Sequence, residues 1–151
     1  MTAGIEVRNA WESRVWSDPA VLILTDRIFM FDVTEDSQFD ALKLIHEQRI
    51  NFFTCQVLRS SVPLIGGSVR YSFRVQVRYF LQQTDEAEST YNAVADRLEL
   101  VDQLVLTTLG KTWGGTVDYY DGAVPQDVVK VTVDDKECWR GGYTYSGFKT
   151  V

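Results

Sequence analysis

The sequence holds few side chains of the types that carry nucleophilic or metal-assisted catalysis. His46 is the only histidine, and the two cysteines, Cys55 and Cys138, lie in apolar, strand-like surroundings. A Ser-His-Asp or Cys-His arrangement needs this histidine beside a nucleophile, and no neighbouring pattern supplies one. A zinc site would need four ligands from these three residues and a carboxylate, at no recognisable spacing. We therefore predict neither a nucleophilic centre nor a metal site.

Carboxylates are plentiful and could in principle supply the acid and base of a glycosidase. They gather in two stretches: Asp32, Glu35, Asp36, Asp40, and then Asp85, Glu86 and Glu88. Charge runs of this kind are more often solvated helix starts. The glycine pairs at 66–67, 114–115 and 141–142 match no phosphate-binding motif, and they predict turns, strand ends or sheet curvature. We therefore predict that the chain is not an enzyme and holds no cofactor.

Charged residues on one predicted strand and one predicted helix indicate a contact between subunits. Arg70, Arg74 and Arg78 share one face of the strand, because strand residues alternate between two faces. The acids of the following helix are Asp85, Glu86, Glu88, Asp96, Glu99 and Asp102. A mixed, solvated surface is one interpretation. The alternative is a head-to-tail contact between the basic strip of one subunit and the acidic helix of the next, which closes into a ring when the rotation permits.

The strand and the helix that carry these charges are the most regular patterns in the chain. Apolar and polar residues alternate over Tyr71–Leu81, which predicts a strand with one buried face. A long helix is predicted from about Asp85 to Leu109. Asp85 and Glu88 have the spacing of a capping box, and Gly110 is a plausible stop.

Weaker patterns predict the remaining elements. A first helix runs from Gly4 to about Trp16, and a second from Gln38 to about Arg49. The apolar runs Val21–Leu24 and Ile28–Val33 are short strands or buried extended segments. Further strands are predicted at Phe52–Leu58, Thr112–Tyr120, Val128–Val133 and Glu137–Tyr145, with turns at Asp121-Gly122 and Asp134-Asp135. The fold class is therefore α+β, with an antiparallel sheet flanked by helices, one long central helix and a C-terminal β meander.

Length and composition predict one globular domain over residues 1–151. The chain is 45% hydrophobic and carries a net charge of −6, so it lacks the basic excess of a free-standing nucleic-acid binder. The start of the chain does not resemble a signal peptide, and no apolar run is long enough to span a membrane. We therefore expect a soluble protein of a reducing compartment with two buried thiols, although a disulfide stays open if the two strands are neighbours.

The chain resembles the tail terminator, or tail completion, proteins of long-tailed bacteriophages. The matching features are the alternating strand Phe73–Phe80, the acidic helix start Thr84–Glu88 and the long helix to Leu109. Two further segments add to the likeness: the predicted strand that contains Trp113-Gly114-Gly115, and the closing segment Tyr143–Gly147. The similarity is one of element order and pattern over most of the chain.

This resemblance implies a structural protein of the virion, made in the bacterial cytoplasm. Such proteins form hexameric rings that cap the tail tube, stop its growth and offer a surface to the head–tail connector or neck protein. DNA passes through the ring without specific binding, and no membrane is involved. The partners implied are other copies of the chain, the tail tube protein and the neck protein.

Candidate residues follow from these expectations. The subunit contact is predicted to use Arg70, Arg74, Arg78, Asp85, Glu88, Asp96 and Glu99. Recognition of partners is predicted for the segment Ala20–Asp36 and for the loop Ser60–Ser68, including Ser60, Ser61, Leu64 and Ile65, because loops often carry binding.

Two other classes of protein compete with this interpretation. The chain could be another neck, head–tail joining or tail tube protein. It could also be an NTF2-like binder or enzyme, whose cone-shaped sheet would enclose a pocket with converging polar groups. The candidate lining of such a pocket is Tyr79, Asp118, Trp139 and Tyr143.

Overall fold

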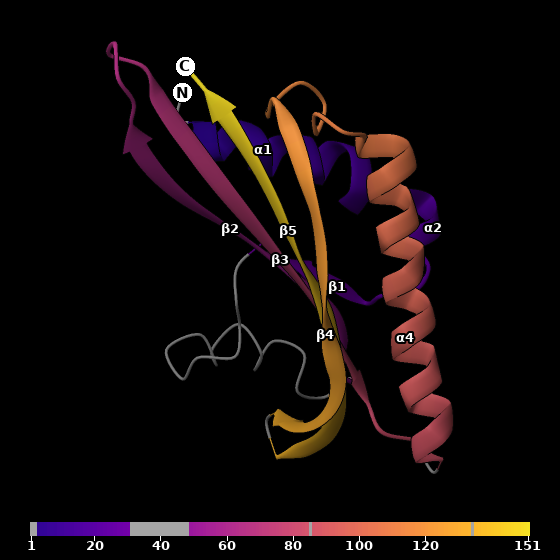
Figure 1. Cartoon of the computed structure of the whole chain (residues 1–151). Coiled ribbons are helices and arrows are strands. Elements are labelled where there is room, and N and C mark those ends of the chain that lie inside the picture. Colours follow the sequence, from indigo (N-terminus) through magenta and orange to yellow (C-terminus); the bar gives the residue numbers. More distant parts are fainter. Residues whose placement is uncertain (1–2, 31–48, 85, 134) are drawn as a thin grey trace.

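The computed structural model describes residues 3–30, 49–84, 86–133 and 135–151 (Figure 1). Its helices are α1 (Ala3–Trp11), η1 (Glu12–Trp16), α2 (Pro19–Leu22), α4 (Ala87–Leu104) and η3 (Val105–Leu109). η1 and η3 are single π-helical turns that follow directly on α1 and α4. The strands are β1 (Arg27–Phe29), β2 (Asn51–Pro63), β3 (Val69–Gln82), β4 (Tyr119–Val133) and β5 (Lys136–Thr150).

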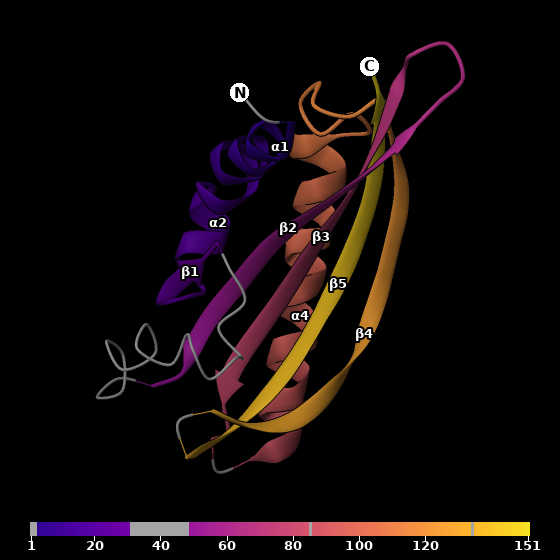
Figure 2. The same ribbon diagram turned by 90° about the vertical axis from the view of Figure 1, so that its left-hand side faces the viewer.

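These strands form one five-stranded sheet in the order β1-β2-β3-β5-β4. β1 runs parallel to β2, and the other neighbours are antiparallel. Two long hairpins, β2–β3 and β4–β5, therefore lie side by side, and α4 connects one to the other (Figures 1 and 2). The predicted α+β class is confirmed, with one short parallel strand at an edge.

One face of the sheet, hereafter the helix face, packs against the helices and forms the main core. The alternation in β3 places Phe73, Val75, Val77 and Tyr79 on this face, and all four are buried. The helices contribute Val7, Trp11 and Val15 from α1 and η1, and Val94, Leu98 and Val101 from α4. Their spacing of three or four residues is what puts each set on one side of its helix.

The opposite side of the sheet, hereafter the second face, holds a smaller apolar cluster. Phe52 and Phe80 stack there with ring centres 4.9 Å apart, and Phe29 meets Phe52 edge-on. The other members are Ile50, Val133 and Cys138. The sheet therefore has apolar packing on both sides at the end that holds β1, the start of β2, the end of β4 and the start of β5. Polar strand residues occupy more of the second face elsewhere.

The regular sequence patterns predict the elements well. The helix at Gly4–Trp16, the strand at Tyr71–Leu81 and the final strand at Glu137–Tyr145 all appear. The face predicted to be buried in Tyr71–Leu81 is buried from Phe73 onward. The long helix ends at Gly110, which has a φ of 75°. The predicted helix at Gln38–Arg49 and most of the run Ile28–Val33 lie outside the described residues.

The prediction for the last third of the chain is wrong at its start. Residues 112–117 form turns, and one continuous strand, β4, replaces the two predicted strands and the turn at Asp121-Gly122. The register of β4 shifts between Tyr120 and Gly122, so the glycine marks an irregularity within a strand. The segment Val21–Leu24 is also not a strand, since its first two residues end α2.

The two cysteines lie on opposite faces of the sheet and are both free and buried. Burial raises the pKa of the Cys55 thiol to about 12 and that of Cys138 to about 11. The predicted buried thiols are confirmed, and a disulfide between them is excluded by this placement.

We expect neither thiol to react with Ellman's reagent in the native protein at pH 8, because the reactive species is the thiolate. Both should react after unfolding in guanidinium, where their pKa values return to about 8.5.

The raised pKa values also predict that the free energy of unfolding falls as pH rises above about 9, since the unfolded chain then releases these protons first. Fast labelling of native protein would contradict the burial of these side chains.

Candidate assembly surfaces

The β2–β3 hairpin projects from the body of the described fold. Its tip extends past the ends of the other strands (Figures 1 and 2). From Asn51 to Gln82 it contains Arg59, Arg70, Arg74 and Arg78 but no lysine and no acidic residue. The hairpin thus carries +4 in a chain of net charge −6, and the other residues together carry −10.

The tip of the hairpin is apolar and exposed. The side chains of Val62 and Leu64 are 54% and 40% exposed, and Ile65 is fully exposed. The turn is closed by a hydrogen bond from the Leu64 amide to the Ser68 carbonyl, 2.8 Å long. Gly66 and Gly67 make it possible, because both have φ values near the left-handed region, 89° and 87°.

The observed loop is shorter at its N-terminal side than the predicted recognition loop Ser60–Ser68. Ser60 and Ser61 are not loop residues but the continuation of β2, paired with Ser72 and Tyr71 of β3. The alternation of β2 weakens after Leu58, so its sequence gave no signal that the strand continues. Leu64 and Ile65 do lie in the turn and remain candidates for recognition.

The three predicted arginines share the second face of the sheet, but their surroundings differ. Arg70 is exposed and its guanidinium lies 3.9 Å from the centre of the Phe148 ring. Arg74 is also exposed and lines a shallow hollow of about 150 Å³ with Leu58, Ser60 and Ser72. Arg78 is half-buried and packs beside Gly142. Arg70 and Arg74 are thus the two that another molecule can reach.

The acidic residues of α4 separate into an outer and an inner group. Glu88, Asp96 and Glu99 are exposed on the side of the helix that faces away from the sheet. Asp102 is turned inward and accepts a hydrogen bond of 2.8 Å from the Tyr145 hydroxyl. Burial, followed by the charge of Asp102, raises the pKa of Tyr145, so this phenol stays a donor.

The predicted capping box at the start of α4 does not describe the observed end. The helix begins at Ala87, and its N-cap residue, Glu86, makes no side-chain capping bond. The Thr90 hydroxyl instead accepts a hydrogen bond from the Thr84 amide at 3.2 Å. Asp85 lies outside the described residues.

A groove opens beside α2, far from the hairpin tip. It has a volume of about 480 Å³ and is bounded by α2, η1 and β1. Trp16, Leu22, Ile28 and Met30 supply its apolar walls, and Glu12, Ser17, Thr25, Asp26 and Arg27 its polar ones. Exposed ion pairs tie its two acids to Arg8 and Arg49, and the exposed Arg27 adds one positive charge to the lining.

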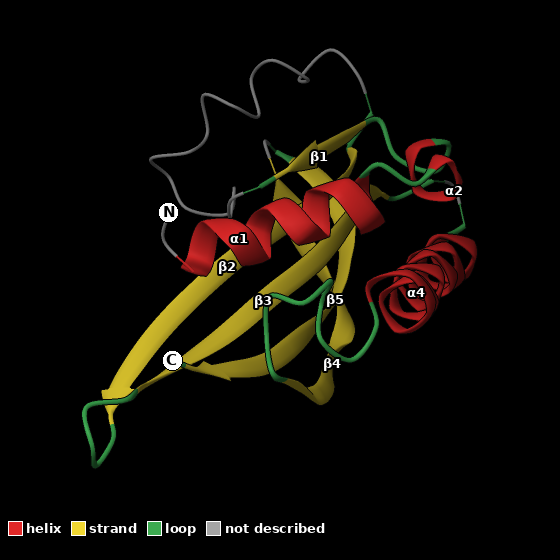
Figure 3. Ribbon diagram, turned by 90° about the horizontal axis from the view of Figure 1, so that it is seen from above, coloured by secondary structure: helices red, strands yellow, loops and turns green. Residues whose placement is uncertain are grey.

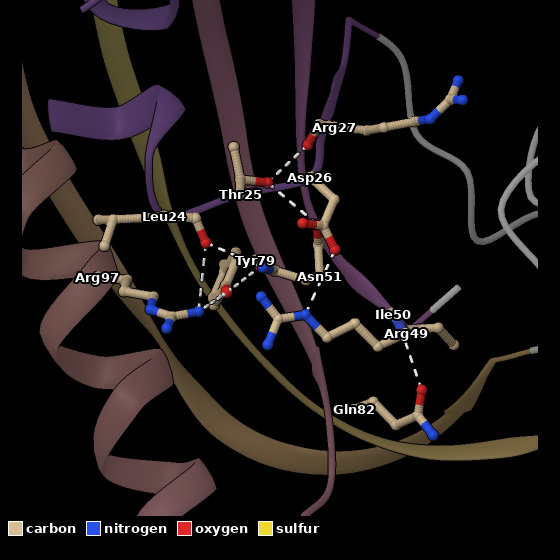
Figure 4. Close-up of polar contacts among 10 residues, drawn as sticks. All are labelled: Leu24, Thr25, Asp26, Arg27, Arg49, Ile50, Asn51, Tyr79, Gln82 and Arg97. Carbon is tan, nitrogen blue, oxygen red and sulfur yellow. Dashed lines mark hydrogen bonds and ion pairs between the residues drawn. The ribbon is translucent and has the colours of Figure 1, made fainter. Parts of the chain in front are cut away.

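A buried polar network fixes the chain next to this groove (Figure 4). Asn51 donates to the Leu24 carbonyl at 3.0 Å and accepts from the Tyr79 hydroxyl. Arg97 reaches across from α4 and donates to the same hydroxyl and, at 3.4 Å, to the same carbonyl. Burial raises the pKa of Tyr79, while Arg97 opposes that rise. The network connects three separate parts of the fold and was not predicted from the sequence.

The residues proposed for an NTF2-like pocket do not all meet, although Trp139 and Tyr143 lie on either side of Gly141, the β5 partner of Tyr79, and pack against the main core. Tyr79 is held in the buried network, whereas the Asp118 carboxylate accepts a hydrogen bond from the Thr150 amide at the other end of the sheet. Trp139 packs edge-on against Tyr91 and donates to Gln83. His46 and the carboxylates at 32–40 lie outside the described residues. In the part of the chain that the structure describes, no cluster of metal-ligating side chains forms.

Comparison with known proteins leaves the family open. No protein-family model matches the chain, and a search of curated proteins finds no significant match. Across the described ranges, no helix is long and apolar enough to cross a membrane.

Proposed function

We propose that the chain is a ring-forming structural subunit at the end of a bacteriophage tail tube, a tail terminator of the virion. The observation that supports this most is the separation of charge within one subunit. Arg70 and Arg74 lie on the second face of the sheet, while the outer acids of α4 lie on the helical side. Two complementary surfaces that point away from each other suit a head-to-tail contact, which closes into a ring or continues as a filament.

On this proposal, the ring works through the shape and charge of its surfaces. One side would complement the last ring of the tail tube and the other the neck protein, while DNA passes through the centre. The excess negative charge outside the hairpin suits this passage, since a negative lumen repels phosphates. Complementary charges between subunits would set their register more than their affinity.

The first test is the mass of the purified chain in solution. Native mass spectrometry and sedimentation should give one discrete multiple of the 17.2 kDa subunit mass, and electron microscopy should show rings. Long tubes would instead favour a tail tube protein. A 17.2 kDa particle at every concentration would contradict the proposal.

Reversing the charges of Arg70 and Arg74 to glutamate should weaken ring formation at least roughly tenfold at low salt, because like charges would then face each other. The difference should shrink at high salt, where exposed charges are screened. Both side chains are exposed, so the monomer should keep its stability, whereas reversal of half-buried Arg78 would confound folding with assembly.

The matched control for this pair is reversal of Arg14 and Lys111, which are exposed, lie outside the lining of the groove and change the net charge equally. It should leave assembly nearly unchanged. Equal effects of the two double variants, measured by sedimentation over a range of salt concentrations, would show that only net charge matters.

A further inference from the structure

We propose that the apolar tip of the β2–β3 hairpin of one copy docks into the groove beside α2 of the next copy. This inference rests on the proposed self-assembly and assigns to it a specific anchor and receptor. It concerns Leu64 and Ile65 on one side, and Leu22 with the groove walls on the other.

The tip has the composition of an anchor for another protein. Ile65 is fully exposed and Val62 and Leu64 are close to half exposed, so water covers three neighbouring aliphatic side chains. Burying such side chains is the main favourable term in protein association. A nucleic acid would use the arginines of the hairpin but offers little to these aliphatic groups, which favours a protein partner.

The receptor side combines apolar walls with nearby negative charge. Leu22 is 50% exposed and Ile23 82% exposed, and Trp16, Ile28 and Met30 continue the apolar surface into the groove. The groove volume of about 480 Å³ is within the range of roughly 300–1,000 Å³ in which proteins hold ligands. Arg97 of α4 donates to Leu24, so the acidic helix runs directly beside this surface.

The charges around the two surfaces are complementary. Arg59, Arg70 and Arg74 flank the apolar tip, and the hairpin has no acidic residue. Asp96 and Glu99 are exposed on α4, whose cation Arg97 is occupied by the buried network. Because the acids within the groove already have partners and the groove lining also carries Arg27, the attraction comes from α4 and the apolar contact from the groove. An apolar anchor within a charged rim is the usual layout of a protein interface.

The positions of the two surfaces require a second copy. Seen from above, the hairpin projects from one end of the molecule while α2 and α4 lie at the other (Figure 3). A hairpin cannot reach the groove of its own chain in this fold. Docking between copies is therefore head-to-tail, as a ring requires.

Ile65→Asp should weaken assembly by roughly ten- to a hundredfold, the loss expected when one aliphatic anchor is removed from an apolar contact. The control is Ile5→Asp, an exposed isoleucine on α1 that lines neither surface. Since neither side chain is buried, thermal unfolding of the two variants should match that of the wild type.

Cross-linking tests the pairing directly. A double variant Ile65→Cys, Leu22→Cys should form a ladder of covalent oligomers on mild oxidation, while the buried native thiols stay inert. The control pair Ile65→Cys, Leu106→Cys uses a side chain of similar exposure, 57%, and should give dimers at most.

The outcomes separate this inference from the proposed function. Rings without a ladder, and with normal assembly of Ile65→Asp, would overturn the docking and leave the ring intact. If the Ile65→Asp variant forms normal rings that fail to cap tail tubes, the hairpin tip contacts the tube and not the next subunit. This result would also overturn the docking. A ladder that closes into no ring of fixed size would support the docking and contradict the tail terminator. Monomers with no ladder would overturn both.

Discussion

Replacing Gly142 by alanine is expected to lower the free energy of unfolding by about 3 kcal/mol, the upper end of the usual cost of over-packing. A Cβ atom at this position would lie 2.3 Å from the carbonyl oxygen of Val77 on the neighbouring strand. Because that oxygen belongs to the backbone, no side-chain rotation relieves the clash, and β5 would have to move away from β3. The melting temperature should fall by roughly 6–12 °C for a chain of this size.

The reason for this tight fit is that the sheet is covered on both sides at one point. A Cβ at Gly141 would meet the Leu98 side chain of α4 at 2.7 Å, and one at Gly142 would also crowd Arg78 at 3.2 Å. The glycine pair thus lets α4 close onto one face while Arg78 lies across the other. The predicted strand Glu137–Tyr145 included the pair, and the pair lies within β5, but the sequence did not indicate the close approach that it permits.

Gly4→Ala is the matched control, because a Cβ at Gly4 meets nothing within 4 Å and alanine is favoured in helices. Its unfolding free energy should equal or slightly exceed that of the wild type. The measurement is urea denaturation of both variants, checked by calorimetry. Equal stability of Gly142→Ala and the wild type would mean that the two strands are not packed as closely as described.

The parts of the fold that were predictable have strong local signals. In β3, six alternating apolar residues must share a face, and one of the two faces of a strand in a small domain is normally buried. In α4, the spacing of Val94, Leu98 and Val101 indicates one buried side in the same way. These two elements alone establish the α+β class and the faces on which their charged residues lie.

The parts that were missed depend on contacts distant in the sequence. Glycine and proline made the segment before residue 128 resemble a turn, yet pairing with β5 keeps β4 continuous through Gly122 and Pro125 by means of register shifts. Trp113 suggested a strand, but it is fully buried in a turn with a φ of 45°. Its packing against Trp11, with ring centres 5.6 Å apart, joins residues about a hundred positions apart.

The same contrast applies to the candidate surfaces. The arginine strip and the acids of α4 follow from periodicity, so the sequence sufficed to place each on one side of its element. The sequence did not indicate which of these charged residues are accessible. The half-burial of Arg78 and the inward turn of Asp102 arise from neighbouring strands. The groove beside α2 had no sequence signal, since its walls come from η1, α2 and β1 together.

Asn51 is the residue whose loss should most clearly connect stability with assembly. Its side chain is almost fully buried and joins the Leu24 carbonyl to the Tyr79 hydroxyl, which Arg97 of α4 also contacts (Figure 4). Its backbone carbonyl accepts hydrogen bonds from the Asp26 amide at 2.9 Å and the Thr25 hydroxyl at 3.2 Å. The path from α2 into β1 is therefore held by this one residue from two sides.

Asn51→Ala should lower the free energy of unfolding by about 3 kcal/mol, because it removes two buried hydrogen bonds and leaves their partners less well satisfied. Combined with Tyr79→Phe, the loss should be less than additive by roughly 1–2 kcal/mol, since both substitutions break the same contact. Asn92→Ala, at an exposed position on α4, should change stability by no more than about 0.5 kcal/mol.

Because the network lies next to the groove, we also expect its loss to weaken assembly without any change in surface charge. If Asn51 holds the connection after α2, then Asn51→Ala should speed hydrogen exchange at the amides of Leu22, Ile23 and Leu24 more than at those of β3. The groove would lose its shape, and rings should form only at higher concentration although every residue of the proposed contact is unchanged. Normal exchange at these three amides in a destabilised variant would show that the network supports the core alone and does not position the groove.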